Sequence, residues 1–218
     1  MPLWFNPESG VPTLVAQSHS FSNTNATSFT FSGMAVGTTS ADRYIVVAVN
    51  VGTGTSFTSV TINGSAATLL VQKAGTLDSA SAIYYLLVSS GTTADIVVTP
   101  NVLSVQCSVS LFSLTGWTGA NTVTNSGNGA SPITLSLTLP NDSVAVGAMR
   151  GTNAFVFDPA VTLTWNGLTV YNTDVASSRG SSQAYANFTT GGSPITISCA
   201  TNATENRSIA GVSAGFYN

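Results

Sequence analysis

Few residues in this 218-residue sequence have the types and the spacing that catalysis requires. The clearest match is Gly211-Val-Ser213-Ala-Gly215, which fits the pattern Gly-x-Ser-x-Gly. In hydrolases this pattern places a nucleophilic serine on a turn between a strand and a helix, with an acid and a histidine later in the chain. Ser213 lies inside an apolar, strand-like run, and no histidine follows it. We interpret the motif as small residues in a strand.

The remaining acids and bases form no catalytic or metal-binding pattern. The single histidine, His19, has no carboxylate beside it, so we interpret it as a surface or joint residue rather than a base or a ligand. Glycoside hydrolysis needs two carboxylates about 5–10 Å apart, but most of those present sit beside turn residues, and Asp42 and Asp142 begin equivalent strands. No Asp-x-Asp-x-Asp loop supplies a calcium site. The carboxylates are Glu8, Asp42, Asp78, Asp95, Asp142, Asp158, Asp174 and Glu205. We expect no enzyme activity, no cofactor and no metal.

Two cysteines, Cys107 and Cys199, each replace an inward residue in an alternating run. We interpret them as buried, reduced thiols that pack as small hydrophobic side chains. A disulfide between them is the alternative. A metal pair is weaker still, because no histidine or further cysteine lies near either one in the sequence.

Composition and charge exclude several classes of partner. Charged residues make up 6% of the chain, against about a quarter in ordinary soluble domains, which indicates a neutral polar surface over an apolar interior. The net charge is −3, and the five basic residues are scattered, so no basic stripe exists for nucleic acid. The first residues lack the basic and apolar regions of a secretory signal peptide, and no apolar run is long enough to span a membrane. We therefore expect a soluble protein made in a cytoplasm, with no membrane partner.

The elements that must position these residues are β-strands. Val60 to Leu70 predicts a hairpin around Asn63-Gly64, because this pair tolerates the positive φ angles of a two-residue turn. In this hairpin Val60, Ile62, Ala67 and Leu69 share one side. From Ser28 onward strands follow one another without a credible helix. The run Tyr44–Val49 is almost continuously apolar, which is typical of a strand covered on both faces.

The second half of the chain repeats the features of the first half in the same order. An Asn166-Gly167 hairpin echoes Asn63-Gly64, and residues 28–117 match residues 132–217 across a Gly/Asn/Ser/Thr-rich joint, Thr118–Ser131. We interpret this as an internal duplication. It predicts an all-β, antiparallel two-sheet β-sandwich that is jelly-roll-like. The halves could form two small sandwiches or interleave into a single body, and the apolar runs favour the single body.

Residues 1–20 are predicted to form an extended arm that precedes the sandwich of residues 21–218. The arm carries Pro2, Pro7 and Pro12, which remove ladder donors and make a central strand unfavourable. Its apolar residues are Leu3, Trp4 and Phe5. These side chains could cover the protein's own core, or they could anchor the arm in a partner subunit, because aromatic residues are enriched at interface hot spots.

The succession of strands resembles a known module. Its residues are Asp42–Val49, Thr58–Leu69 with the Asn-Gly turn, Ala82–Leu86, Thr92–Val98 and Val109–Trp117. Together they resemble a β-sandwich module of tailed-phage structural proteins that is also found in bacterial extracellular proteins. The resemblance covers about Ser28 to the last residue and brings no catalytic residues. It implies a virion structural protein, a capsid decoration or fibre component, that binds capsid or other virion subunits and further copies of itself.

A carbohydrate-binding or adhesin module is the alternative function. Such modules present exposed aromatic rings beside polar groups. Trp165 shares a face with apolar residues and is expected in the core, whereas Tyr171 lies on a threonine-lined face. Tyr171 and Trp117 are therefore the candidate glycan platform.

Overall fold

Every regular element of the computed structural model is a β-strand, within the residues that it describes: 10–52, 56–74, 79–119, 121–129, 133–153, 163–176, 179–189, 194–201 and 206–218. All strand pairs are antiparallel. This confirms the predicted all-β class and the β-sandwich. Leu3, Trp4 and Phe5 lie outside the described residues.

The first half of the chain forms two sheets. The first inner sheet has the order β1-β9-β3-β7-β6, and the first outer sheet has the order β2-β8-β4-β5. Successive strands pass between these two sheets as they do in a jelly roll. The strands are β1 (Thr13–Ser22), β2 (Phe29–Ala35), β3 (Tyr44–Val51), β4 (Phe57–Ile62), β5 (Ser65–Ala66), β6 (Thr68–Ala74), β7 (Ala80–Leu87), β8 (Thr93–Pro100) and β9 (Cys107–Thr115).

The second half forms two further sheets with a matching strand order. The second inner sheet is β10-β17-β12-β15-β14, and the second outer sheet is β11-β16-β13. Each strand of the second inner sheet takes the place of its counterpart in the first. The strands are β10 (Asn121–Gly129), β11 (Ile133–Thr138), β12 (Ser143–Asn153), β13 (Leu163–Asn166), β14 (Thr169–Ala176), β15 (Arg179–Phe188), β16 (Pro194–Thr201) and β17 (Asn206–Tyr217). The duplication itself stays a prediction.

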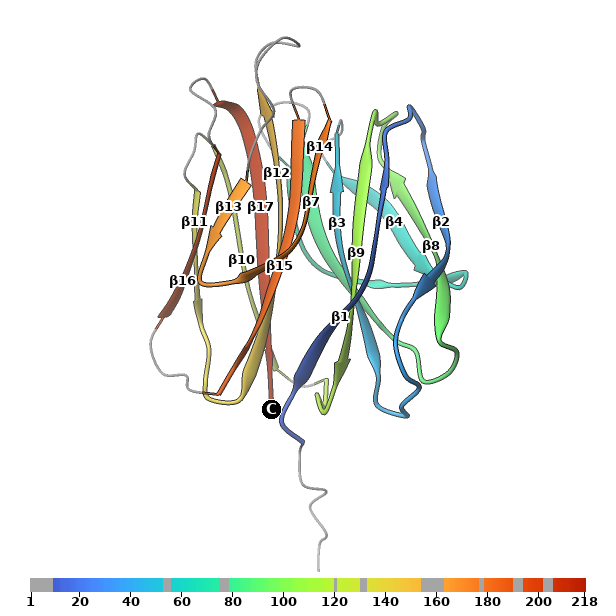
Figure 1. Ribbon diagram of the computed structural model, residues 1–218, viewed down its shortest axis with the longest axis vertical. Helices are drawn as coiled ribbons and strands as arrows, with labels where there is room; N and C mark the ends of the chain where they lie inside the picture. The colour runs from blue at the N-terminus through green and yellow to red at the C-terminus, as the bar shows by residue number, and fades with distance from the viewer. Residues whose placement is uncertain are drawn as a thin grey trace, which may run out of the picture.

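The four sheets stack as layers, with the two inner sheets facing each other at the centre (Figure 1). Among the described residues, each half pairs its strands only with its own, so the halves pack side by side and do not interleave into one pair of sheets. The expectation that Tyr44–Val49 is covered on both faces is confirmed. Ile45 and Val47 enter the core beneath the first outer sheet, while Val46 and Ala48 enter a core shared by the two inner sheets.

Two segments that lack apolar periodicity nevertheless form edge strands. Thr118–Ser131, expected as a connecting loop, contains β10, which pairs with β17 alone. Most of β1 falls within residues 1–20, expected as an arm, and β1 pairs with β9 alone. An edge strand has one ladder and little covered area, so it can form from residues that give no strong strand signal.

The first hairpin forms as expected, with φ of 49° at Asn63 and 79° at Gly64. Val60 and Ile62 are buried in the first core, each 1% exposed. Leu69, which was expected on the same side, is 42% exposed. The chain leaves the outer sheet after β5 and joins the inner sheet as β6, so the alternation of the hairpin ends before Leu69 is reached.

A fully buried arginine holds two loops at one end of the first half. Arg43 precedes β3 and is 0% exposed. Its guanidinium donates five hydrogen bonds of 2.8–3.0 Å to backbone carbonyls, namely those of Gly37, Thr38, Val88, Ser90 and Gly91. Burial lowers the pKa of Arg43, but a guanidinium stays protonated in proteins. Every donor of the group is therefore used to join the β2–β3 loop to the β7–β8 loop.

Candidate functional site at the seam between the two jelly rolls

The two inner sheets meet over a central apolar core, and a polar cluster lies where β1 and β14 run beside each other. The core contains aliphatic and aromatic side chains from both halves: Leu14, Val46, Ala48, Ile83, Phe112, Leu114, Trp117, Val144, Val146, Ala148, Val212, Ala214 and Phe216. The polar cluster, which we name the seam cluster, comprises His19, Ser108, Ser110, Asn172, Asp174 and Gln183.

Two β-bulges turn the ionisable residues of the seam cluster toward each other. In β1, Leu14 and Ala16 face the central core, and a register shift between Ala16 and Ser18 inserts one residue before His19. The insertion reverses the alternation, so His19 is opposite Ser110 of β9 and faces the second half. A register shift between Val170 and Asn172 in β14 precedes Asp174.

His19 contacts the second half of the chain through Nε2 and its own half through Nδ1. Its Nε2 lies 2.9 Å from Asp174 Oδ1, an ion pair when the ring is protonated. Its Nδ1 lies 3.0 Å from Ser110 Oγ. The Asn172 amide approaches Nε2 at 2.8 Å. The side chains of His19 and Asp174 are 18% and 13% exposed, so solvent reaches the pair while most of its surface is covered.

The second oxygen of Asp174 is held by residues below the surface. Ser108 Oγ donates to Asp174 Oδ2 at 2.6 Å, Gln183 Nε2 donates to Ser108 Oγ at 2.8 Å, and Ser110 Oγ donates to Gln183 Oε1 at 3.2 Å. Ser108, Ser110 and Gln183 are each 0% exposed. Burial raises the pKa of Asp174, but the hydrogen bonds from His19 and Ser108 and the charge of His19 outweigh it and leave the pKa below its usual value.

Serine, histidine and aspartate in contact suggest the chemistry of a hydrolase, but the geometry differs from that of a working triad. A nucleophilic serine must reach a substrate and donate its proton to the histidine. The Ser110 hydroxyl is fully buried beneath the seam and also contacts Gln183. The arrangement is suited to holding two β-sheets together through charge-assisted hydrogen bonds, which are stronger than neutral ones.

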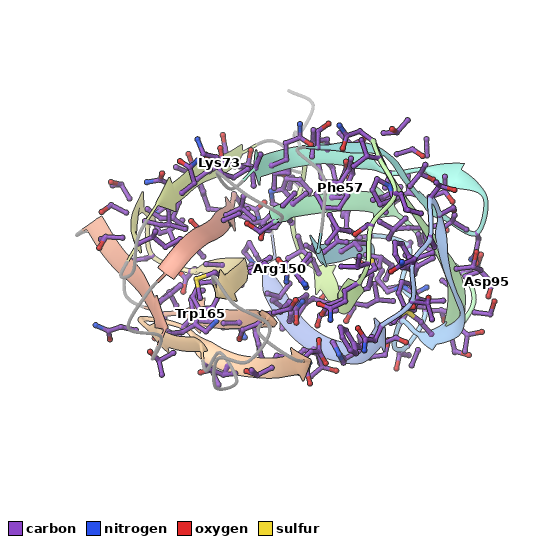
Figure 2. All side chains as sticks on the ribbon, turned by 90° about the horizontal axis from the view of Figure 1, so that it is seen from above. Phe57, Lys73, Asp95, Arg150 and Trp165 are labelled. Atoms are coloured by element: carbon purple, nitrogen blue, oxygen red, sulfur yellow. The ribbon has the colours of Figure 1, made fainter. Side chains whose placement is uncertain are left out.

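A second polar contact crosses the seam through Arg150 of β12. This side chain is 0% exposed and lies between the two halves when the molecule is seen from above (Figure 2). It donates to Ser181 Oγ at 2.6 Å and to the side-chain oxygen of Gln106 from the first half. A Cβ atom on Gly52 would lie 2.8 Å from the Arg150 guanidinium. The glycine therefore leaves room in the first half for the arginine side chain of the second half.

Strand β1 is also fastened to the second half along its backbone. The amide of Asn187 in β15 accepts from the Leu14 N–H at 2.9 Å and donates to the Leu14 carbonyl at 3.0 Å. These are the backbone groups that point away from β9, so Asn187 occupies part of the free edge of β1. The side chain of Asn218 donates to the carbonyls of Gly10 and Gly116.

An open pocket of about 550 Å³ lies at the start of β1. Val11 and Val15 supply its apolar wall, while Gln17 and Asp42 are among its polar groups. Both Asp42 oxygens are already engaged, one by the Ser40 hydroxyl and the other by the Gly116 N–H. These two hydrogen bonds lower the pKa of Asp42. The carboxylate supports the loops around the pocket, as the expected turn role of Asp42 implies.

The structure corrects the expectation that Trp117 offers a glycan platform. Trp117 is 3% exposed and belongs to the central core, with its ring 4.9 Å from Tyr44 and 5.1 Å from Phe216. Its indole N–H donates to the Asn121 carbonyl. Tyr171 is partly buried against Phe112 and does not adjoin Trp117 in these ring contacts. Packing between the two halves therefore covers aromatic surface that a sugar would need for stacking.

The other candidate chemical groups take structural positions. Ser213 lies inside β17 opposite Asn125 and Gly147, without the strand–turn–helix that a nucleophile requires. Cys107 is buried and free, which confirms the expected reduced thiol and excludes its disulfide with Cys199. Asp142 has a φ of 55°, consistent with its expected turn role. Within the described ranges, no group of three or more His, Cys, Asp or Glu residues could hold a metal ion.

No protein-family model matches the chain, and neither a curated protein nor a solved structure matches it. Within the described part of the chain, no helix has the length and apolar character to cross a membrane.

Sequence reasoning placed His19 at a surface or joint and found no carboxylate for it. The structure places it at the joint and supplies Asp174, 155 positions away in the sequence. One signal was available in β9, where Ser108 and Ser110 lie on the same face of the strand as the core residues Phe112 and Leu114. Hydroxyl groups on a face that packs against another sheet indicate a polar partner across the interface.

Proposed function

We propose that this chain is a non-enzymatic structural protein of a virion, a capsid decoration or fibre component attached through the part of the expected arm that precedes β1. The observation that carries the proposal is the continuous core between the two inner sheets, which joins two jelly rolls into one unit. Such a unit is suited to a structural role, in which a protein holds other subunits in place, rather than to catalysis. The sequence resemblance to tailed-phage modules supplies the virion context.

The polar groups of the seam add support. Its buried serine, glutamine and arginine side chains bond to partners in the opposite half, and they strengthen the joint between the jelly rolls. The buried position of Trp117 counts against the carbohydrate-binding alternative, which loses one of its two expected platforms.

The proposal is tested by measuring how much of this protein co-sediments with purified virions. The double variant Trp4→Ala, Phe5→Ala should reduce the occupancy at least tenfold, because aromatic anchors contribute about 2 kcal/mol or more at hot spots. Leu87→Ala is the matched control, because Leu87 is an apolar side chain on the body that is 51% exposed. Absence of the protein from particles would overturn the virion role. Equal occupancy of the two variants would overturn the attachment through the segment that precedes β1.

A further inference from the structure

Three Asn-Gly pairs occur in the chain, and the fold places them in different surroundings: Asn63-Gly64, Asn128-Gly129 and Asn166-Gly167. In such a pair the glycine nitrogen is able to attack the Cγ atom of the asparagine side chain, because glycine has no Cβ atom that hinders the approach. The attack has two requirements. The side-chain amide must rotate over the following peptide bond, and the backbone between the two residues must adjust so that the ring closes.

Asn63 meets neither requirement. Its Oδ1 accepts a hydrogen bond from the Asp95 N–H at 2.8 Å, and its own N–H donates to the Asp95 carbonyl at 2.8 Å. These two bonds fasten the side chain and the backbone of Asn63 to β8. The backbone is also fixed by the two-residue turn between β4 and β5, with φ of 49° at Asn63 and 79° at Gly64. Asn63 must therefore break hydrogen bonds before Cγ reaches the Gly64 nitrogen.

Asn128 is exposed but is held through its backbone. Asn128 and Gly129 both belong to β10, where they lie opposite Ala210 and Ile209 of β17. The peptide bond that joins them is part of an antiparallel ladder, so a rotation of the backbone at this point would disturb the pairing with β17. This pair meets the first requirement and fails the second.

Asn166 is free of both restraints. It is the last residue of β13, an edge strand of four residues that pairs with β16 alone. The residue is exposed, and its side chain has no hydrogen-bond partner among the described residues. Gly167 lies beyond the ladder and has a φ of 85°. The side-chain amide is therefore free to rotate, and the following peptide bond is not fixed by strand pairing.

We infer that Asn166 is the deamidation site of the folded protein, a modification that is independent of the proposed virion role. The Gly167 nitrogen forms a bond to Asn166 Cγ and loses its proton, and the side-chain nitrogen leaves as ammonia. The product is a five-membered succinimide. Water then opens either carbonyl of the ring, which gives aspartate or isoaspartate at position 166. The reaction consumes one water and releases one ammonia, so it needs no co-reactant other than the solvent.

The two products change the charge and the packing of the second half. Each adds a carboxylate to a chain whose net charge is −3. The isoaspartate product also inserts a methylene group into the backbone between Trp165 and Leu168. Both of these side chains pack closely on Gly147, where a Cβ atom would lie 2.7 Å from Trp165 and 3.0 Å from Leu168. The isoaspartate form is therefore expected to have a lower midpoint of thermal unfolding than the unmodified protein.

The first test follows the three asparagines by peptide mapping and mass spectrometry while the full chain is incubated at mildly alkaline pH. Native protein is compared with protein unfolded in guanidinium chloride, because unfolding removes the contacts that distinguish the three sites. In the unfolded chain the three sites should react at similar rates. In the native protein Asn166 should react at least about tenfold faster than Asn63, since hydrogen bonds must first be broken at Asn63.

The second test follows the acidic form of the aged native protein by isoelectric focusing. Asn166→Gln should abolish this form, because a glutamine side chain would have to close a less favourable six-membered ring. Asn128→Gln is the matched control, since it changes an exposed asparagine that also precedes a glycine, and it should leave the acidic form unchanged. Equal rates at Asn166 and Asn63 in the native protein would overturn the inference, as would an acidic form that persists in Asn166→Gln.

Discussion

The buried guanidinium of Arg43 provides the most direct test of how this fold stabilises its loops. Arg43→Lys keeps the positive charge but replaces five donors by three. The guanidinium serves five carbonyls, so at least two of them lose their partner. An orphaned buried acceptor costs about 1–3 kcal/mol, which gives about 2–6 kcal/mol for two. Because water can reach loops at the end of a sandwich, we expect a loss of about 2–4 kcal/mol in the free energy of unfolding.

The assay is urea unfolding at neutral pH, followed by tryptophan fluorescence. For a slope of about 3 kcal/mol per molar urea, a loss of about 3 kcal/mol moves the midpoint by about 1 M. Lys73→Met is the control, because it removes a cation from a partly exposed position on β6 and should change the free energy by less than about 0.5 kcal/mol. A midpoint for Arg43→Lys equal to that of the control would refute the reasoning from donor number.

Three further predictions concern other parts of the structure. Gly147→Ala should cost about 1–3 kcal/mol in thermal unfolding, because its Cβ would lie 2.7 Å from the Trp165 ring; a change within about 0.5 kcal/mol would contradict the packing. The folded-state pKa of Asp174 is lowered, so its stabilisation is present above the unfolded value of about 3.9 and is lost as the pH falls through the folded value. The stability difference between wild type and Asp174→Asn should therefore shrink on acidification, and a difference that grows would contradict this sign. Burial raises the pKa of the Cys107 thiol, so a thiol reagent should modify it only in unfolded protein. The difference in labelling between wild type and Cys107→Ser gives the reaction at Cys107. Fast reaction of this thiol in the native protein would contradict its burial.

The parts of the fold that follow from local pattern could be predicted from the sequence. Alternation in β11 puts Ile133, Leu135 and Leu137 in the buried positions, because a half-covered strand repeats every two residues. The Asn63-Gly64 turn follows from backbone sterics alone. Such features depend on residues that are neighbours in the chain.

The seam cluster could not be predicted because it depends on two inserted residues and on the packing of two sheets. A strict alternation continued from Leu14 and Ala16 would point Ser18 toward the second half and turn His19 to the opposite face. The bulge reverses this, and a second bulge precedes Asp174. No pattern within either strand encodes which residue of the other sheet it will meet. The burial of Arg43 was missed for a related reason, since its carbonyl partners come from loops rather than from a complementary charge.

The hydrogen bonds from Asn218 to the Gly10 and Gly116 carbonyls have a practical consequence for engineering. The entry to β1 and the exit of β17 lie together at one pole (Figure 1), so a short linker could splice them into a circularly permuted backbone. The permutant could be reopened between Val102 and Leu103, which are 48% and 54% exposed at the far pole. A cargo fused at the reopened ends would then project from the pole opposite to the entry of β1.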